Sequence, residues 1–241
     1  MTTATITSSR RTTWPVGRPV GAVAGAALVV AGVWNALVQL HITVDSPPAH
    51  IGPQVPPAQA MHTYYTWYAT TVSQQRAASI AGMVGVTGLV ILAVELRRRI
   101  SPDPWGRAAC SALQTGGVLW LVGSIAAVGG HRAVGLMATH SNPIETVNAV
   151  AFTTDVTSDA FSAAGILLLG IGMLAMGGSS YRGRRWSGLS SLTGLLAVVV
   201  AYGYVAGIDS ITTYELGILA AVLTPAWLVW TGRLLDRETT D

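Results

Sequence analysis

The chain has 241 residues, 51% of them hydrophobic and only 10% charged, whereas about a quarter of the residues in a soluble domain are charged. Several uncharged runs approach the ~18–20 residues that a spanning helix requires, so the sequence predicts an all-α polytopic membrane protein. All 14 basic residues are arginine and there is one cysteine, which excludes lysine-dependent chemistry, an internal disulfide and any multi-cysteine metal site.

The N-terminal tail, residues 1–19, is rich in Thr and Ser and is expected to be disordered. Residues 20–40 form the first predicted span, which is longer than a typical signal-peptide core and is therefore expected to be retained. GxxxG pairs, which allow close packing in a homo-oligomer or a membrane complex, occur in this span and at the end of the fifth: Gly21 with Gly25, and Gly203 with Gly207.

The longest connection, residues 42–75, has two parts. The first, DSPPAHIGPQVPP, contains too many prolines for a helix or a strand and is expected to be an extended loop. The second, AQAMHTYYTWYATTVSQQ, repeats large side chains at helical spacing and gathers aromatic residues that suit a membrane interface. We expect an amphipathic helix there, carrying Tyr64 and Trp67, that either lies on the membrane surface or continues into the second span.

Five further spans complete a predicted six-helix bundle. Their expected bounds are about 77–96, 108–130, 147–177, 186–207 and 213–235, and residues 236–241 form a C-terminal tail. The polar dipeptide His131-Arg132 is expected to end the third span.

The arginines predict the orientation of the bundle. If the N-terminus is cytoplasmic, twelve of the fourteen arginines lie on the cytoplasmic side, and only Arg76 and Arg132 lie outside. The positive-inside rule therefore predicts that both termini are cytoplasmic, and we expect the cytoplasmic membrane of a bacterium. The net positive charge is interpreted as this orientation signal, so no nucleic-acid partner is expected.

Two acids stand out at the polar end of the fourth span. Asp155 and Asp159 lie one helical turn apart, and a count back from Gly177 places both near the outer boundary of the hydrocarbon. Neighbouring carboxylates there can serve as a proton carrier, an acid/base pair or a cation site. Alternatively, they hydrate the interfacial end of the helix or pair with Arg76 or Arg132.

Other polar residues are expected at the same outward-facing vestibule, where they would join the two acids as ligand-binding residues: Asn35, Gln39, Tyr64, Trp67 and Glu215. All five histidines also fall on that side, and His41, His62 and His131 are candidate ligands of Zn or Cu. They lie on different segments and form no HxxxH, HExxH or HxH motif, so neither a metal nor a haem between His41 and His131 is favoured.

Three functions remain open. The first is binding or transport of a small ligand, a cation or a proton at the vestibule. The second is an enzyme that acts on a lipid or isoprenoid at the outer leaflet, with Asp155 or Asp159 as the catalytic proton donor. The third is a non-catalytic subunit or accessory protein of a membrane complex. Neither a GxSxG motif nor a nucleotide-binding glycine motif is present.

Overall fold

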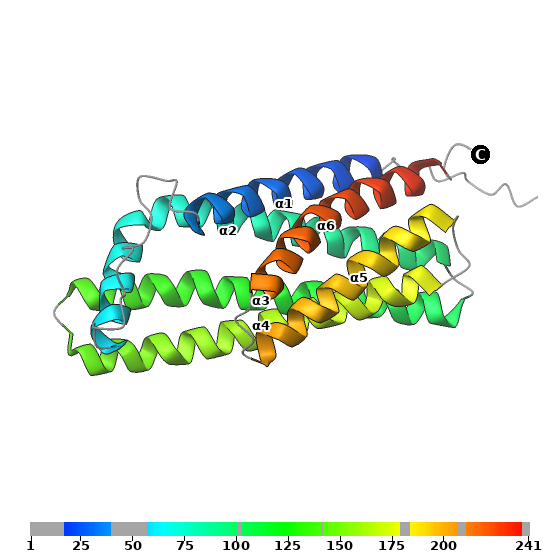
Figure 1. The fold of residues 1–241 in the computed structure, drawn as a ribbon. Coiled ribbons are helices and arrows are strands. Elements are labelled where there is room, and N and C mark those ends of the chain that lie inside the picture. The colour runs from blue at the N-terminus through cyan, green and yellow to red at the C-terminus, as the bar shows by residue number, and fades with distance from the viewer. Residues whose placement is uncertain are drawn as a thin grey trace, which may run out of the picture.

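The computed structural model describes residues 17–39, 57–100, 103–140, 142–178, 184–206 and 211–237. They form six helices: α1 Gly17–Gln39, α2 Pro57–Ile100, α3 Pro104–Thr139, α4 Ile144–Gly178, α5 Arg184–Val205 and α6 Ile211–Arg237 (Figure 1). The prediction of an all-helical bundle is confirmed, and α1 to α5 each contain a stretch long and apolar enough to cross a membrane. In α6, the side chains of the first ten residues lie outside the described part of the chain.

Two helices are longer than the sequence predicted. The aromatic segment and the second span form one continuous helix, α2, which is one of the two expected arrangements. The helix that contains the third predicted span does not stop at His131-Arg132, because α3 continues to Thr139. The reason is tertiary packing: Val134 of this extension is fully buried against Val147 and Ala151 of α4. The predicted N-terminal tail up to residue 16 and the proline-rich loop lie outside the described residues.

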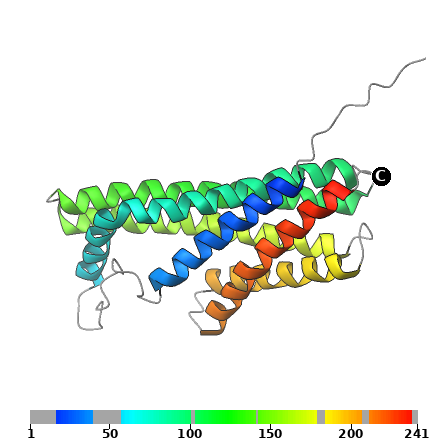
Figure 2. The same cartoon turned by 90° about the horizontal axis from the view of Figure 1, so that it is seen from above.

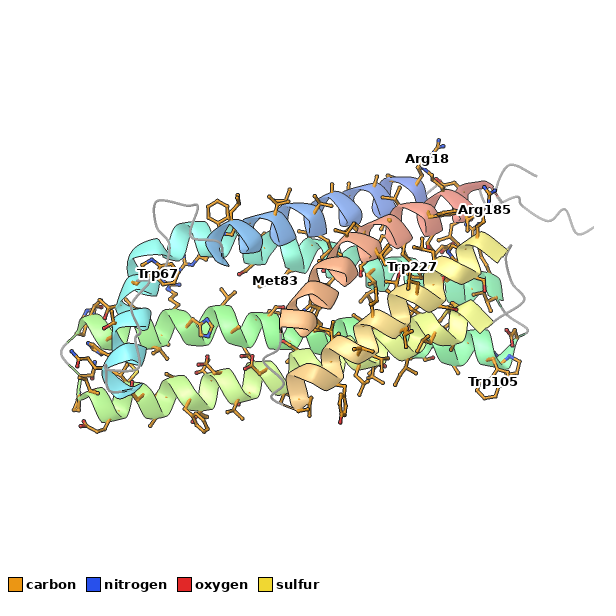
Figure 3. All side chains as sticks on the ribbon, in the orientation of Figure 1. Arg18, Trp67, Met83, Trp105, Arg185 and Trp227 are labelled. Carbon is orange, nitrogen blue, oxygen red and sulfur yellow. The ribbon has the colours of Figure 1, made fainter. Side chains whose placement is uncertain are left out.

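One end of each of the six helices lies at the same end of the bundle, which we call the arginine end because α1, α2, α3, α5 and α6 all carry arginine there. Figure 3 shows Arg18 at the start of α1 and Arg185 at the start of α5 there. The carboxylate of Asp236, near the end of α6, accepts hydrogen bonds from the backbone N–H groups of Gly17 and Arg18 at 3.0 and 2.8 Å. This carboxylate satisfies two N–H groups that the first turn of α1 leaves unpaired, so it caps the helix.

The end of α2 is tied to the same place. Arg99 forms an ion pair with Glu95 at 3.0 Å and donates a hydrogen bond to the backbone carbonyl of Leu235 in α6. A guanidinium at this position satisfies a C-terminal carbonyl and complements the negative end of the helix dipole.

Small residues at seven-residue intervals bring α3 and α4 into backbone contact. Ala109, Gly116 and Gly123 of α3 face Gly172, Gly165 and Ser158 of α4. A methyl group added at Gly165 would lie only 2.7 Å from the backbone nitrogen of Trp120, so no larger residue fits there. A seven-residue repeat keeps the same face of each helix on the partner, as in a coiled coil, and this repeat sets the register of the α3–α4 pair.

The other contacts between helices use similar residues. Gly170 of α4 faces Gly194 of α5, and Gly21 and Gly25 of α1 lie against the backbone of α6 at Leu228 and Pro225. The first GxxxG pair is therefore occupied within the chain. Between α5 and α6, the buried indoles of Trp186 and Trp227 stack with ring centroids 6.5 Å apart.

The α3–α4 pair projects beyond the rest of the bundle. These helices have 36 and 35 residues, so each is about 50 Å long at ~1.5 Å per residue, whereas the hydrocarbon of a bilayer is ~30 Å thick. Because both helices reach the arginine end, the excess length lies at their other end, residues 124–139 and 144–159, which we call the projecting hairpin. The first part of α2 crosses this hairpin (Figures 1 and 2).

Candidate functional site

An imidazole and a carboxylate meet on the projecting hairpin. Nε2 of His131 in α3 lies 2.8 Å from Oδ1 of Asp155 in α4. The His131 side chain is 20% exposed and the Asp155 side chain is 37% exposed, so the pair is partly sheltered but reachable from solvent. The ring donates its N–H to the carboxylate, and the contact becomes an ion pair when the imidazole is protonated.

The packing of small residues explains why these two side chains meet. A Cβ added at Gly130 would lie 2.1 Å from Cγ2 of Thr154, so α3 and α4 are in close contact at this level. His131 and Asp155 are the next residues on the two helices, and each extends along the same side of that contact. Asp155 also lies four residues after Ala151, which is fully buried in the interface. Position 155 therefore faces the α3–α4 interface, as a core position of a coiled coil does. Such positions usually hold an apolar residue, whereas here Asp155 pairs with His131.

Buried residues flank the His131–Asp155 pair in both directions along α4. Ser158 is buried one turn further along α4, and its hydroxyl donates to the backbone carbonyl of Asp155 at 3.1 Å. In the other direction, Val134, Val147 and Ala151 form a small buried cluster. The pair thus lies between a glycine-lined interface and an apolar cluster, which restricts both side chains.

The two aspartates, which share a helical face, have different environments. Asp155 is partly buried and hydrogen-bonded to His131, whereas Asp159 is exposed on the surface of α4. Asp159 has no ion pair with any residue that the structure describes. Arg132, one of the partners that the sequence suggested for the acids, is also exposed. The structure therefore joins Asp155 to a histidine of the neighbouring helix and leaves Asp159 exposed.

The remaining predicted site residues are described only in part. His62 and Trp67 are half-buried on the first part of α2, which crosses the projecting hairpin (Figure 3 labels Trp67 there). The side chains of Asn35, Gln39, Tyr64 and Glu215 lie outside the described residues, although their helices are defined, and His41 lies outside them altogether. Within the described ranges, no group of three or more His, Cys, Asp or Glu residues could hold a metal ion.

Two grooves on the part of the surface that the structure describes are not lined by the acids. One, of about 460 Å³, lies along the projecting hairpin and includes three threonines: its lining is Ala126, Ala149, Val150, Thr153, Thr154 and Thr157. The other, of about 400 Å³, is apolar and lies between α1 and α2. An apolar groove beside Asp155, which a lipid-modifying enzyme requires, is not among these two.

The interior of the bundle carries no buried charge within the described residues. Its buried polar side chains are Ser158, Ser190, Thr193 and Thr231.

No protein-family model, curated protein or solved structure matches the chain.

The pairing of His131 with Asp155 was missed from the sequence, but a signal for it exists. Small residues recur every seven positions from Ala109 to Gly130 and again from Ala151 to Gly172. Aligning these two series in antiparallel order pairs Gly130 with Ala151, which places His131 and Asp155 within two helical turns of each other on the facing helices. The polar residues by themselves, 24 positions apart, contain no such information.

Proposed function

We propose that this chain is a six-span protein of a bacterial cytoplasmic membrane, with both termini inside, that binds a small cation at its projecting outer hairpin. The observation that carries the proposal is the 2.8 Å contact between His131 and Asp155. The imidazole holds one carboxylate oxygen of Asp155 in place, while the side chain stays exposed enough for a ligand to reach it. A carboxylate restrained in this way attracts a cation or a hydrogen-bond donor without first losing conformational freedom.

Two observations support the membrane topology. The starts of α1, α3 and α5 and the ends of α2, α4 and α6 meet at the arginine end, so successive helices alternate in direction. The arginines gathered there agree with a cytoplasmic location of this end. The topology is tested with single cysteines at Ala49 and Gly183, in a chain whose native cysteine is replaced by Cys110→Ser. An impermeant thiol reagent added to intact cells should label position 49 only; labelling of both positions would refute the topology.

Binding is a better expectation than transport for this arrangement. A transport path needs polar groups through the bundle, and in the described part of the interior the buried polar residues are four, Ser158, Ser190, Thr193 and Thr231, with no charged residue among them. The contacts of α4 with α3 and α5 are also backbone to backbone, which leaves little room between these helices. In proteoliposomes with an imposed pH gradient and an enclosed pH-sensitive dye, we expect no proton flux above that of empty vesicles.

The binding test uses thermal unfolding of the detergent-solubilised protein at constant ionic strength. Na⁺, K⁺, tetramethylammonium and Zn²⁺ are added one at a time as chlorides. We expect at least one of them to raise the midpoint of the wild-type protein, because a ligand that binds only the folded state stabilises it. Asp155→Asn should abolish this rise, and Asp159→Asn, one turn away and exposed, is the matched control that should keep it.

Two results would refute the binding proposal. One is a midpoint that none of the four cations raises. The other is a rise of equal size in the wild type and in the Asp155→Asn variant, which would place the binding elsewhere on the protein.

A further inference from the structure

The apolar groove between α1 and α2 carries a second inference, which is independent of the His131–Asp155 site. The groove has a volume of about 400 Å³, and its lining is almost entirely apolar: Pro19, Val20, Val23, Ala24, Ile80, Met83, Val84, Thr87, Gly88 and Ile91. The hydroxyl of Thr87, the most polar side chain in the groove, donates to the backbone carbonyl of Met83 at 2.8 Å. This internal hydrogen bond leaves the wall without an unsatisfied donor.

The length of the groove corresponds to one leaflet. Its lining on α2 extends from Ile80 to Ile91, which is about 16 Å at ~1.5 Å per residue, and half of a ~30 Å hydrocarbon layer is about 15 Å. The lining on α1, from Pro19 to Ala24, falls within the first eight residues of that helix, so the groove reaches toward the arginine end. Val23, Ile80 and Ile91 are exposed along it, so the groove is open on its lipid-facing side.

An arginine lies in line with the groove at that end. Ile80, Val84, Thr87, Ile91, Val94 and Arg98 follow one another at spacings of three or four residues, so they form one face of α2. Arg98 is 74% exposed. Side chains of a helix lean toward its N-terminus, which directs this guanidinium back along the groove, over Val94.

Arg98 shares its acidic partner, Glu95, with a second arginine. Glu95, the nearby acid on α2, accepts two hydrogen bonds from Arg99, at 3.0 and 3.2 Å, and its contact with Arg98 is longer, at 3.4 Å. Arg97 is a further exposed cation beside it. The mouth of the apolar groove is therefore positively charged.

We propose that the α1–α2 groove binds one acyl chain of an anionic phospholipid, whose phosphate is held by Arg98. The occupant follows from charge and shape together. A long apolar groove opens to the bilayer and leads toward a cluster of arginines that outnumbers its one acid on α2, Glu95, and this arrangement complements a lipid with an apolar chain and a negative headgroup. Basic sites between spanning helices at a membrane surface bind anionic headgroups by this attraction.

The test is native mass spectrometry of the detergent-solubilised protein with added phosphatidylglycerol or phosphatidylcholine of the same acyl chains. We expect one bound phosphatidylglycerol that survives detergent washing, and clearly weaker binding of phosphatidylcholine. Arg98→Gln should lower the phosphatidylglycerol affinity roughly fivefold, since a basic residue near a membrane surface contributes about that factor. Arg107→Gln, which removes an exposed arginine from α3 at the same end, is the matched control and should bind normally.

A second pair of variants tests the groove itself. Ile91→Trp places a large side chain in the groove, whereas Val118→Trp places the same side chain on the exposed face of α3. Only the first should lose the lipid. The proposal is overturned if phosphatidylcholine binds as well as phosphatidylglycerol, if Arg98→Gln equals Arg107→Gln, if Ile91→Trp retains the lipid, or if the groove proves to hold a second copy of the chain. Because all four sites are exposed, the variants should fold, and circular dichroism verifies this.

Discussion

His131 of α3 and Asp155 of α4 form a hydrogen bond of 2.8 Å, and Asp159, one turn further along α4, is left exposed. Asp155 thus has a partner on the neighbouring helix. This contact joins the two helices of the projecting hairpin. Because the Asp155 side chain is 37% exposed, a ligand can reach it.

The first prediction concerns the stability that this hydrogen bond supplies. His131→Ala should lower the free energy of unfolding by about 1 kcal/mol, the usual net value of a partly exposed hydrogen bond. With Asp155→Ala, a double-mutant cycle should give a coupling of about 0.5–1.5 kcal/mol, because the residues are in direct contact. Asp159→Ala should change stability by less than ~0.5 kcal/mol and should not couple to His131→Ala. Denaturant unfolding in detergent measures all three, and a zero coupling would contradict the pairing.

The second prediction concerns the glycines of α3. In Gly123→Ala, the added methyl group would lie 2.5 Å from Oγ of Ser162 and 2.8 Å from the backbone oxygen of Ser158, both in α4. We expect α3 and α4 to separate slightly, with a loss of about 1–3 kcal/mol, the cost of overpacking.

Gly129 of the same helix is the control for this substitution. No atom lies within 4 Å of a Cβ at this position, so Gly129→Ala should be neutral or stabilising by up to ~1 kcal/mol through helix propensity. Equal effects of the two substitutions on the unfolding midpoint would contradict the close α3–α4 contact.

The third prediction concerns the two stacked tryptophans of α5 and α6. Trp227 donates its indole N–H to the hydroxyl of Ser190 at 2.8 Å, and Trp186 donates to the hydroxyl of Thr231 at 3.1 Å. Trp227→Phe removes a buried donor and part of the ring, so we expect a loss of about 2–4 kcal/mol from the hydrogen bond and the cavity together. Trp105, which is 76% exposed, is the control, since Trp105→Phe should have almost no effect on the unfolding midpoint.

The fourth prediction concerns the cap of α1. Asp236→Ala removes the carboxylate that accepts from the N–H groups of Gly17 and Arg18, and we expect a loss of about 0.5–2 kcal/mol, typical of a lost N-terminal cap. Asp236→Asn keeps one oxygen acceptor and should lose about half as much. In hydrogen exchange, the first turn of α1 should become less protected in the alanine variant, while α3 should remain unchanged.

Much of the fold follows from local sequence properties. An apolar run of sufficient length becomes a helix in lipid because each backbone N–H and C=O must be paired within it. Each of the six predicted spans therefore overlaps one observed helix, and four of the six lie within three residues of the observed bounds at both ends. The gathering of arginines at one end also follows directly from their positions along the chain.

The extension of α3 beyond the predicted span, and the partner of the first GxxxG pair, could be found only from the tertiary structure. Nothing local predicts that α3 passes through the polar dipeptide His131-Arg132, because the extension is stabilised by the burial of Val134 against α4. The GxxxG pair at Gly21 and Gly25 indicates a close-packing face but not which helix packs there. In the structure this face packs against α6 of the same chain.

The candidate site shows the same division. The sequence by itself determined that Asp155 and Asp159 lie at the polar end of a helix long and apolar enough to cross a membrane, since periodicity along one helix is a local property. Only the tertiary structure decided which of them has a partner, because the register between α3 and α4 depends on glycines and alanines that meet across the interface. Close packing of those small residues brought His131 to Asp155 and left Asp159 at the surface.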